Sequence, residues 1–419
     1  MLSDFSHNLE RITNWILDSG IHSRHVFRNA DAFYESFHSS KKKYSFLYCE
    51  ITGYAINFLL NLYKIKQEEN FLNTAKKAGN FLVRFQAKEG NLRGAIPWNV
   101  NEDGKAHHLY YSFDTGVCLN GLMDLYMVTG EKQYLQSAVM AADWLISQAQ
   151  NDDGSYRAVF DRTQNVFNSF MLLKYWSGDR GCLHIKNIRG LIKAYKISRN
   201  EEYLKSIRKT MAWSKKMQDE DGSFPAAQGK DFIFTHAHCY AIEGIISAFI
   251  YCNDTECRRQ ILAAADWLLK TQNRDGSFYD YYHLPNIFLR LRLSDSRVKR
   301  IYHGTITVDS QKIIRIKRTD ATSQAARILA FAYLITQNSR YKKAALKALN
   351  FINKLQSGSP NKNENGGICF GRLDFMGIKR KSRLYTSWSG MFAANAMYLL
   401  GQIQDNRNID PDHFNEILF

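Results

Sequence analysis

The chain has 419 residues, of which 45% are hydrophobic and 13% aromatic, so it can bury a large core and falls outside the disordered class. It carries 56 Lys and Arg against 40 Asp and Glu, a formal net charge of +16. This surplus favours anionic partners such as nucleic acid, acidic lipid or acidic polysaccharide, although a solvated basic surface gives the same composition. No zinc-finger spacing or RNA-binding signature is present, so we do not expect nucleic acid as a partner.

The N-terminal segment 1–20 carries charges within its apolar stripe, unlike a signal peptide. No uncharged run reaches the roughly 18 residues that a membrane span needs, so no transmembrane segment is expected. The seven cysteines are scattered and form no CxxC pair, which is typical of reduced thiols. We therefore expect a cytoplasmic protein. Its oligomeric state is left open.

Predicted helices of two kinds alternate along the chain. Amphipathic helices with apolar residues at helical spacing cover 7–20, 69–91, 131–148, 201–218, 258–272 and 339–356. More apolar helices, which should be buried, cover 52–63, 115–126, 185–195, 239–249, 323–333 and 388–398. The chain thus begins with an outer helix and ends with an inner one. Pairing these two helices would close a ring of six hairpins in a single domain, 1–419.

A short sequence follows three of the outer helices: QNDDGSY at 150–156, QDEDGSF at 218–224 and QNRDGSF at 272–278. Gly supplies a residue with positive φ, Asp can bond the turn backbone, and the aromatic residue can pack at the helix exit. The segments also resemble the Gln-Trp repeats of terpene cyclases, whose acidic catalytic motif is not seen here. We interpret them as structural turns.

The segment Phe113–Gln148, beginning FDTG, resembles the group of unsaturated glucuronyl hydrolases, N-acylglucosamine epimerases and polysaccharide lyases. The segment Tyr48–Ile56, YCEITGYAI, resembles bacterial and archaeal proteins expected in polysaccharide synthesis. Both resemblances imply an all-α (α/α)6 toroid. They are specific for architecture and weak for the reaction, because one fold hosts many chemistries. In such a toroid the inner helices line a funnel, and their N-terminal ends converge on its mouth.

Alignment of the inner helices on the aromatic residue that closes each one brings polar residues to one level. The closing residues are Tyr63, Tyr126, Tyr195, Phe249, Tyr333 and Tyr398, and the positions eleven to thirteen residues earlier include Glu50, Asp114, His184, His236, His238 and Asp320. A purely structural repeat would place apolar or capping residues there. We therefore predict that the functional site lies at this rim.

Glu50, Asp114 and Asp320 are carboxylates on three different helices. Two carboxyls of unequal pKa are what acid–base hydrolysis of a glycosidic bond requires. The alternative is helix capping, which Asp performs well and Glu poorly. The resemblance implies that Asp114 matches a region where unsaturated glucuronyl hydrolases keep a functional aspartate.

His236 and His238 could act as a general base, and His184 could bind a sugar, although a lone His is more often a satisfied polar residue. The spacing of His236, His238 and Cys239 is not that of a standard zinc site, so neither a metal nor a cofactor is expected. Aromatic residues near the same level could stack on sugar rings or could pack the core, and the candidates are Tyr111, Trp176, Tyr385 and Trp388.

An insertion, 279–320, interrupts the repeat with alternating segments typical of short strands, and is expected to act as a lid or interface. It is basic, and further basic clusters, 41–43 and 379–383, precede two other inner helices. Clustering on the mouth side indicates an anionic ligand. Arg can grip a carboxylate through two hydrogen bonds, and Arg318 and Arg383 lie nearest the rim.

These features predict a carbohydrate-active enzyme that works on an acidic oligosaccharide or polysaccharide. Hydrolysis is the first reaction class, with Glu50 or Asp114 as acid and Asp320 or a His as base. Elimination or C5 epimerisation of a uronic acid is the nearest alternative, followed by a non-catalytic glycan-binding protein. A cyclase of isoprenoids or peptides is disfavoured, because it requires an apolar cavity or a metal site.

Overall fold

The computed structural model describes residues 2–27, 29–168, 176–227, 232–282, 316–375 and 378–405, together with positions 409, 414, 415 and 417. Most of the predicted insertion 279–320 lies outside the described residues. Its described ends are short strands, β11 (Phe278–Tyr279) and β12 (Tyr281–Tyr282) before the gap and β13 (Ile316–Arg318) after it.

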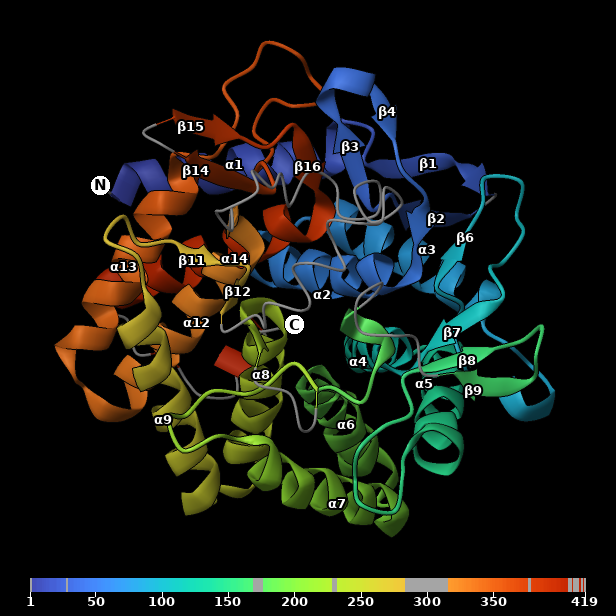
Figure 1. Ribbon diagram of the computed structural model, residues 1–419. Helices are drawn as coiled ribbons and strands as arrows, with labels where there is room; N and C mark the ends of the chain where they lie inside the picture. The colour runs from blue at the N-terminus through green and yellow to red at the C-terminus, as the bar shows by residue number, and fades with distance from the viewer. Residues whose placement is uncertain are drawn as a thin grey trace, which may run out of the picture.

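Two concentric layers of helices form the described structure (Figure 1). The inner layer consists of α2 (Cys49–Lys66), α4 (Ser112–Thr129), α6 (Ile188–Ser198), α8 (Thr235–Cys252), α12 (Thr319–Thr336) and α14 (Ser387–Gln404). The outer layer consists of α1 (Leu2–Asp18), α3 (Glu69–Phe85), α5 (Lys132–Trp144), α7 (Glu201–Met217), α9 (Thr255–Thr271) and α13 (Ser339–Asn353). Each inner helix contacts the next, and α14 contacts both α2 and the N-terminal helix α1. The predicted (α/α)6 toroid is therefore confirmed.

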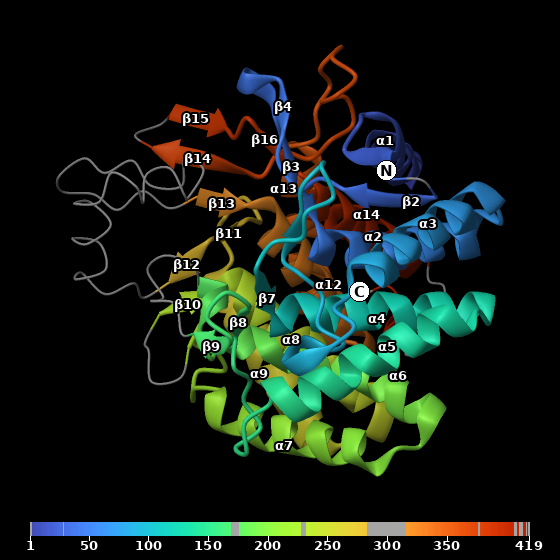
Figure 2. The ribbon, with the colours of Figure 1, turned by 90° about the vertical axis from the view of Figure 1, so that its right-hand side faces the viewer.

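Short strands gather at the end of the ring where the inner helices begin (Figure 2). A strand directly precedes each of α2, α4, α8, α12 and α14, whereas the 3-10 turn η5 (Cys182–Asn187) precedes α6. These preceding strands are β5 (Leu47–Tyr48), β7 (Leu109–Tyr111), β10 (Ile233–Phe234), β13 and β16 (Leu384–Thr386). Pairing with neighbouring strands fixes where each of these helices starts.

The other strands complete small antiparallel sheets. They are β1 (His22–Phe27), β2 (Ala30–Phe33), β3 (Ser36–His38), β4 (Lys43–Tyr44), β6 (Asn99–Val100), β8 (Val159–Asp161), β9 (Val166–Asn168), β14 (Gly371–Phe375) and β15 (Ile378–Lys381). The largest sheet has the order β11-β13-β14-β15, and a second has the order β16-β3-β4. Both sheets connect segments that are far apart in the sequence.

The inner helices end in a repeated way that explains why their closing aromatic residues align. The residue four positions after the aromatic adopts positive φ, and its N–H bonds back to the aromatic carbonyl in α2, α4, α6, α8 and α12. This left-handed residue stops the helix. It is Gly130 after α4, but Gln67, Arg199, Asn253 and Gln337 elsewhere.

The glutamine of the repeated turn joins one outer helix to the next. The Nε2 of Gln272, after α9, donates to the Gly276 carbonyl of its own turn at 3.1 Å and to the Ala344 carbonyl of α13 at 2.9 Å. Gln86, Gln150 and Gln218 reach the neighbouring helix in the same way. We call this arrangement the glutamine clasp.

The same clasp closes the ring. Gln356, after α13, donates to the Gly366 carbonyl at 3.0 Å and to the Asn8 carbonyl of the N-terminal helix α1 at 2.9 Å. The backbone also approaches closely here, because a Cβ on Gly366, whose φ is +84°, would lie 2.2 Å from the Arg11 carbonyl oxygen. The two ends of the helical repeat are thus joined like any two neighbours.

The Asp-Gly-Ser turns are structural, as their sequence predicts. The Oδ1 of Asp275 accepts hydrogen bonds from both the N–H and the hydroxyl of Ser277, at 3.2 and 2.6 Å. A Cβ on Gly276, at φ +93°, would lie 2.1 Å from the Lys347 carbonyl oxygen of the next outer helix. Only Gly permits this approach. The other two copies repeat both features.

Within the described part of the chain, no helix combines the length and the apolar character that crossing a membrane requires.

The clasp predicts that Gln356→Ala lowers the free energy of unfolding by about 1–3 kcal/mol, because the buried Gly366 carbonyl and the partly buried Asn8 carbonyl lose their donor. Gln356→Glu should cost at least as much, since a carboxylate cannot donate to a carbonyl. The measurement is urea-induced unfolding. The control is Gln133→Ala on the exposed face of α5, with an expected change within about 0.5 kcal/mol. Equal effects at both positions would contradict the role of the clasp.

Candidate active site

The rim residues face two different ways. At three of the positions eleven residues before a closing aromatic, a Thr hydroxyl accepts a hydrogen bond from a backbone N–H in the segment that precedes its helix. Thr52 accepts from Phe33, Thr115 from Ile96 and Thr322 from Phe278, at 3.1 to 3.2 Å. This position anchors the loops that connect the two layers of helices.

His238 and His184 occupy this anchoring position. The Nδ1 of His238 accepts from the N–H of Phe224, the aromatic residue of the second Asp-Gly-Ser turn, at 3.1 Å. The Nε2 of His184 lies 3.1 Å from the Asp179 carbonyl oxygen, and its ring packs on Tyr156. Burial lowers the pKa of His238 to about 3 and that of His184 to about 4. The structure therefore does not bring either histidine into the cluster described next.

His236 and Asp320 face each other from α8 and α12. The His236 Nε2 lies 3.9 Å from Asp320 Oδ2, and its Nδ1 lies 2.5 Å from the side-chain oxygen of Gln324. Burial lowers the pKa of His236 to about 4, against the opposing effect of the Asp320 charge. The imidazole is therefore neutral at pH 7.

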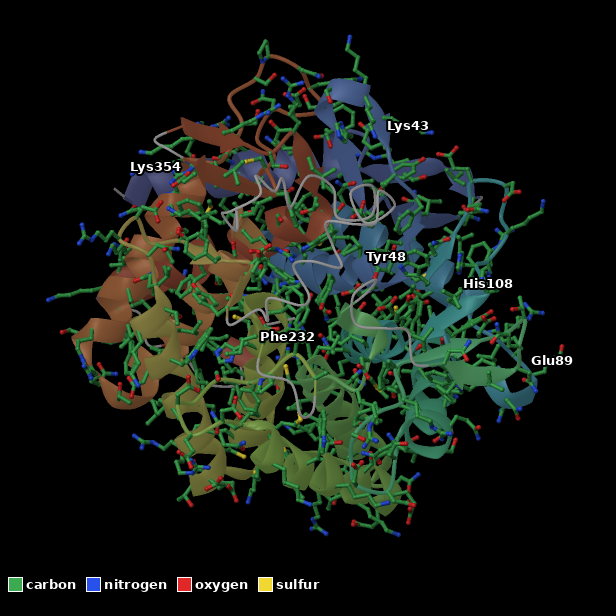
Figure 3. The ribbon with its side chains drawn as sticks, in the orientation of Figure 1. Lys43, Tyr48, Glu89, His108, Phe232 and Lys354 are labelled. Carbon is green, nitrogen blue, oxygen red and sulfur yellow. The ribbon has the colours of Figure 1, made fainter. Side chains whose placement is uncertain are left out.

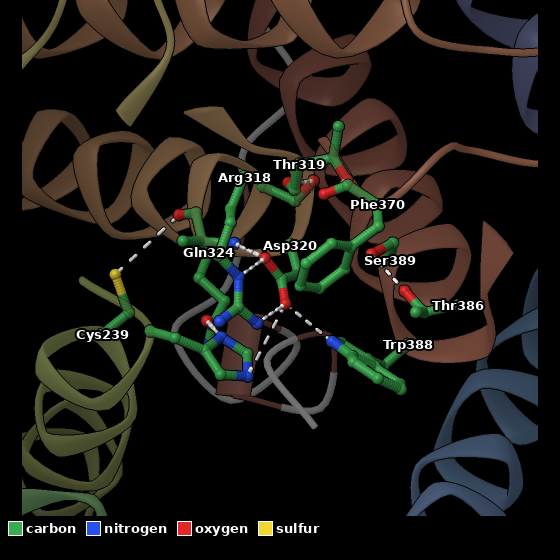
Figure 4. Close-up of polar contacts among 12 residues, drawn as sticks. Cys239, Arg318, Thr319, Asp320, Gln324, Phe370, Thr386, Trp388 and Ser389 are labelled. Atoms are coloured by element: carbon green, nitrogen blue, oxygen red, sulfur yellow. Dashed lines mark hydrogen bonds and ion pairs between the residues drawn. The ribbon is translucent and has the colours of Figure 1, made fainter. Parts of the chain in front are cut away.

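Asp320 is held ionised by its neighbours (Figure 4). Arg318 binds both carboxylate oxygens, with 2.9 Å from Nε to Oδ1, and Trp388 Nε1 donates to Oδ2 at 2.7 Å. Burial alone would raise the pKa of Asp320, but Arg318, His236 and Trp388 lower it to about 2. Arg318 and Trp388 were predicted to bind substrate. In this structure they bind a carboxylate of the protein itself.

A buried charge network lies below these residues. Glu243 of α8 forms ion pairs of 2.7 Å with Lys186 and with Arg327, and accepts from Gln324 at 3.2 Å. Gln324 in turn contacts His236. Glu243 and Arg327 are completely buried, and Lys186 is 4% exposed. This network connects the Asp320 side of the ring to the opposite side.

Sequence reasoning missed the network, although a signal was present. His236, Tyr240 and Glu243 are spaced i, i+4, i+7 and so lie on one face of α8. Asp320, Gln324 and Arg327 repeat the spacing on α12. Polar residues at helical spacing on otherwise apolar inner helices indicate a polar interior that extends beyond the first turn of each helix.

Glu50 and Asp114 are two buried carboxyls that interact on the other side of the rim. Burial raises the pKa of Glu50 to about 7, against hydrogen bonds from Tyr48 and Tyr54 and the charge of Lys186. Burial, and secondly the charge of Glu50, raise the pKa of Asp114 well above its usual range. Glu50 is 8% and Asp114 3% exposed, and Tyr48 interacts with both. At neutral pH this pair therefore retains a proton.

Lys186 links the carboxyl pair to the charge network. Its Nζ lies 3.2 Å from the Tyr54 hydroxyl and 4.4 Å from the centre of the Tyr240 ring. Burial lowers the pKa of Lys186 to about 7, although Glu243 opposes this effect. A line of contacts thus runs from Glu50 through Tyr54 and Lys186 to Glu243.

The other predicted residues differ in their positions. Tyr111 ends β7 and is buried beside Trp98, with 6.0 Å between the ring centres. It adds to the effect of burial in raising the pKa of Tyr48. Tyr385 packs on Trp15 of the outer helix α1, away from the cluster. Arg383 is exposed just before β16. The side chain of Trp176 lies outside the described residues.

The arrangement provides a neutral carboxylic acid, a neutral imidazole and an ionised carboxylate from different inner helices. Divergent pKa values of this kind are what acid–base chemistry requires. Among the residues that the structure describes, no three His, Cys, Asp or Glu side chains are grouped so that they could hold a metal ion.

Comparison with known proteins agrees with the fold. Residues 51–224 match the family model of glycosyl hydrolase family 76. A sugar epimerase from a ruminal bacterium is similar in structure with a TM-score of 0.74, at 13% identity over 98% of this chain and 100% of that one. Cellobiose 2-epimerase from Bacillus thermoamylovorans B4167 gives 0.73, at 15% identity over 96% and 99% of the two chains.

An unsaturated glucuronyl hydrolase from Bacillus sp. GL1, described as responsible for the degradation of glycosaminoglycan, gives a TM-score of 0.64 at 14% identity over 97% of both chains. An uncharacterized protein of Caenorhabditis elegans, B0495.5, is 27% identical over 124 residues. That match spans 26% of this chain and 17% of the worm protein. The predicted resemblance to toroid proteins of the epimerase and glucuronyl hydrolase group is confirmed at the level of the fold.

The carboxyl pair predicts a measurable titration. The infrared carbonyl band of a protonated carboxyl should persist at pH 6 and disappear as the pH rises through about 7. Glu50→Gln should remove this transition. Its persistence in the variant, or an ionised pair already at pH 5, would contradict the assignment.

The same pKa has a consequence for stability. Because the folded-state pKa of Glu50 lies above its ordinary value of 4.5, the folded protein binds this proton more tightly than the unfolded chain does. The resulting stabilisation is complete below about pH 4.5 and is lost as the pH rises through about 7. Glu50→Gln should therefore be less sensitive to pH over that range.

Proposed function

We propose that the protein is a carbohydrate-active enzyme that hydrolyses a glycosidic bond in an acidic oligosaccharide or polysaccharide. The observation that carries this proposal is the buried Glu50–Asp114 pair, whose pKa values are raised, on the same rim as Asp320, whose pKa is lowered. Protonation of a leaving oxygen at neutral pH needs a carboxylic acid whose pKa is raised, and this pair provides one.

In the proposed reaction, Glu50 or Asp114 donates a proton to the glycosidic oxygen as the bond to the sugar breaks. His236 is neutral and can accept a proton from the attacking water. Asp320, ionised and 3.9 Å away, stabilises the imidazolium that forms. The proton balance closes when the imidazolium releases its proton to solvent and the acid takes one back. Asp320 thus assists the base instead of acting as the base, because Arg318 and Trp388 already occupy its oxygens.

Two comparisons support a carbohydrate substrate. The family match to glycosyl hydrolases, 51–224, begins one residue after Glu50 and includes Asp114. The similar structures include enzymes that act on sugars, among them sugar epimerases and unsaturated glucuronyl hydrolases. They share the fold with this chain at low identity, so they support the substrate class and leave the reaction open.

An acidic substrate is supported by the charges inside the ring. Lys186, Arg189 and Arg327 are buried, while Glu243 is the carboxylate that directly pairs with Lys186 and Arg327. Arg189 contacts only neutral groups in its described hydrogen bonds, Ser247 Oγ at 2.9 Å and the Asn415 carbonyl at 2.9 Å. With Glu50 and Asp114 protonated, cationic groups dominate the interior, which favours a carboxylated sugar.

A cytoplasmic protein of polysaccharide biosynthesis remains part of the proposal. The cysteines support a reducing compartment, since each of the seven is a free thiol and six of them are buried.

Epimerisation is the second candidate, supported by His236. A neutral imidazole beside a carboxylate can remove a proton from carbon, and two of the similar structures are epimerases. This reaction would incorporate solvent deuterium into the sugar without cleaving a bond, whereas hydrolysis would release a reducing end. Elimination of a uronate would instead generate an ultraviolet-absorbing double bond.

Substitution of the carboxyl pair should separate these possibilities. For hydrolysis of uronate-containing disaccharides, Glu50→Gln and Asp114→Asn should each lower kcat/KM by about a hundredfold or more. Wild-type kcat/KM should fall as the pH rises through about 7, because the acid must be protonated. Product release is followed by chromatography of the reducing ends.

The matched control is Glu89→Gln. Glu89 is exposed in the loop that follows the outer helix α3, so this variant should leave kcat/KM unchanged. If both carboxyl variants hydrolyse the panel at the wild-type rate, the proposed acid is wrong. If only His236→Ala loses activity and deuterium enters the sugar, the epimerase candidate replaces hydrolysis.

A further inference from the structure

Two basic segments that are more than 330 residues apart in the sequence lie side by side at one edge of the ring. The sheet β16-β3-β4 joins them, since Leu384 pairs with His38 and Phe37 pairs with Tyr44. The Ser39 N–H donates to the Arg383 carbonyl at 2.9 Å. We call seven side chains the basic ridge: those between β3 and β4 or at the start of β4, those of β15, and the one just before β16, namely Lys41, Lys42, Lys43, Lys379, Arg380, Lys381 and Arg383.

The side chains of the basic ridge are exposed, and none of them has a carboxylate within ion-pair distance in the part of the chain that the structure describes. Of the nearby carboxylates, Asp374 is paired with Lys317 at 2.8 Å and with Arg372 at 2.6 Å, and Glu364 accepts a hydrogen bond from Ser39 Oγ at 2.7 Å. Figure 3 shows Lys43 at the periphery of the molecule, away from Tyr48 on the inner side of the ring. Among the residues that the structure describes, the ridge therefore presents an excess of positive charge to solvent.

The basic ridge is continuous with the candidate active site. Arg383 precedes β16, and β16 leads directly into α14, whose Trp388 binds Asp320. On the other side, β15 pairs with β14, and Gly371 of β14 pairs with Arg318 of β13, the second group that binds Asp320. The ridge therefore lies beside the strands that position Arg318 and Trp388 on Asp320.

Like charges on neighbouring strands repel each other, and this repulsion costs stability unless an anion is bound. An anionic polymer bound along several Lys and Arg side chains releases counterions, so its affinity depends steeply on salt.

We propose that the basic ridge is a second binding surface, which holds the polyanionic saccharide chain that extends out of the rim. This inference rests on the proposed function for the chemistry of the chain, and it adds where the chain runs and that length matters. The protein should therefore prefer long acidic oligosaccharides over disaccharides of the same sugar.

The test measures binding of fluorescently labelled oligogalacturonate, as a long chain and as a disaccharide, by anisotropy at two salt concentrations. The ridge variants are K41A/K42A/K43A and K379A/R380A/K381A. Each should weaken binding of the long chain by about tenfold or more and reduce the salt dependence, while binding of the disaccharide is unchanged. The control is K205A/R208A/K216A on the exposed face of α7, which removes the same charge and should match the wild type.

Ridge variants that bind the long chain as tightly as the wild type would overturn the inference. So would equal losses in the control, which would indicate net charge alone. Tighter ridge-dependent binding of a single-stranded oligonucleotide of equal charge would also overturn it, in favour of nucleic acid. Ridge-dependent binding of oligogalacturonate without any turnover of saccharides would leave the ridge in place and count against the proposed enzyme.

Discussion

The glutamine clasp is the interaction on which the rest of the structure depends. Each clasp fixes the spacing of two adjacent outer helices through backbone carbonyls, and the clasp of Gln356 applies the same rule between the last and the first outer helix. Because the ring is closed, the inner helices begin at a common level. Residues separated by some 270 positions, such as Glu50 and Asp320, therefore lie on one rim.

The interior of the ring determines what this rim can do. Ionising a buried carboxyl costs free energy, so its protonation state depends on the groups that it contacts. Asp320 binds Arg318 and Trp388 and is held ionised. Glu50 and Asp114 have no ion pair with a cation in the described part of the chain, and burial raises their pKa values. Glu243 holds Lys186 and Arg327 between these two regions. Carboxyl side chains are thus ionised at one position of the ring and protonated at another.

Much of the fold was predictable from the sequence, because its period is explicit. The Trp, Gln and Asp-Gly-Ser spacing identified the outer helices, and the closing aromatic residues aligned the inner ones. The site was less predictable. The alignment brought His236 and His238 to the same rim, but two residues along a helix rotate a side chain by more than half a turn, so His238 anchors Phe224 while His236 meets Asp320.

Other features of the site depend on contacts that no local pattern contains. Arg318 was expected to bind a substrate carboxylate. The sequence does not show that the Arg318 guanidinium instead binds Asp320, two residues later. Lys186 lies in the 3-10 turn η5, and the groups it contacts, Tyr54 and Glu243, come from α2 and α8. The divergence of pKa values between Glu50 and Asp320 follows from burial and neighbours, which are properties of the folded ring.

The most direct test of the central claim is a crystal structure of the Glu50→Gln variant with an acidic disaccharide bound. The account predicts that the glycosidic oxygen lies within hydrogen-bond reach, about 2.6–3.2 Å, of the side chain at position 50 or of Asp114, with the sugar between them and His236. A disaccharide bound elsewhere on the toroid, or carboxyls at positions 114 and 320 turned only toward the amides of their own helices, would contradict it.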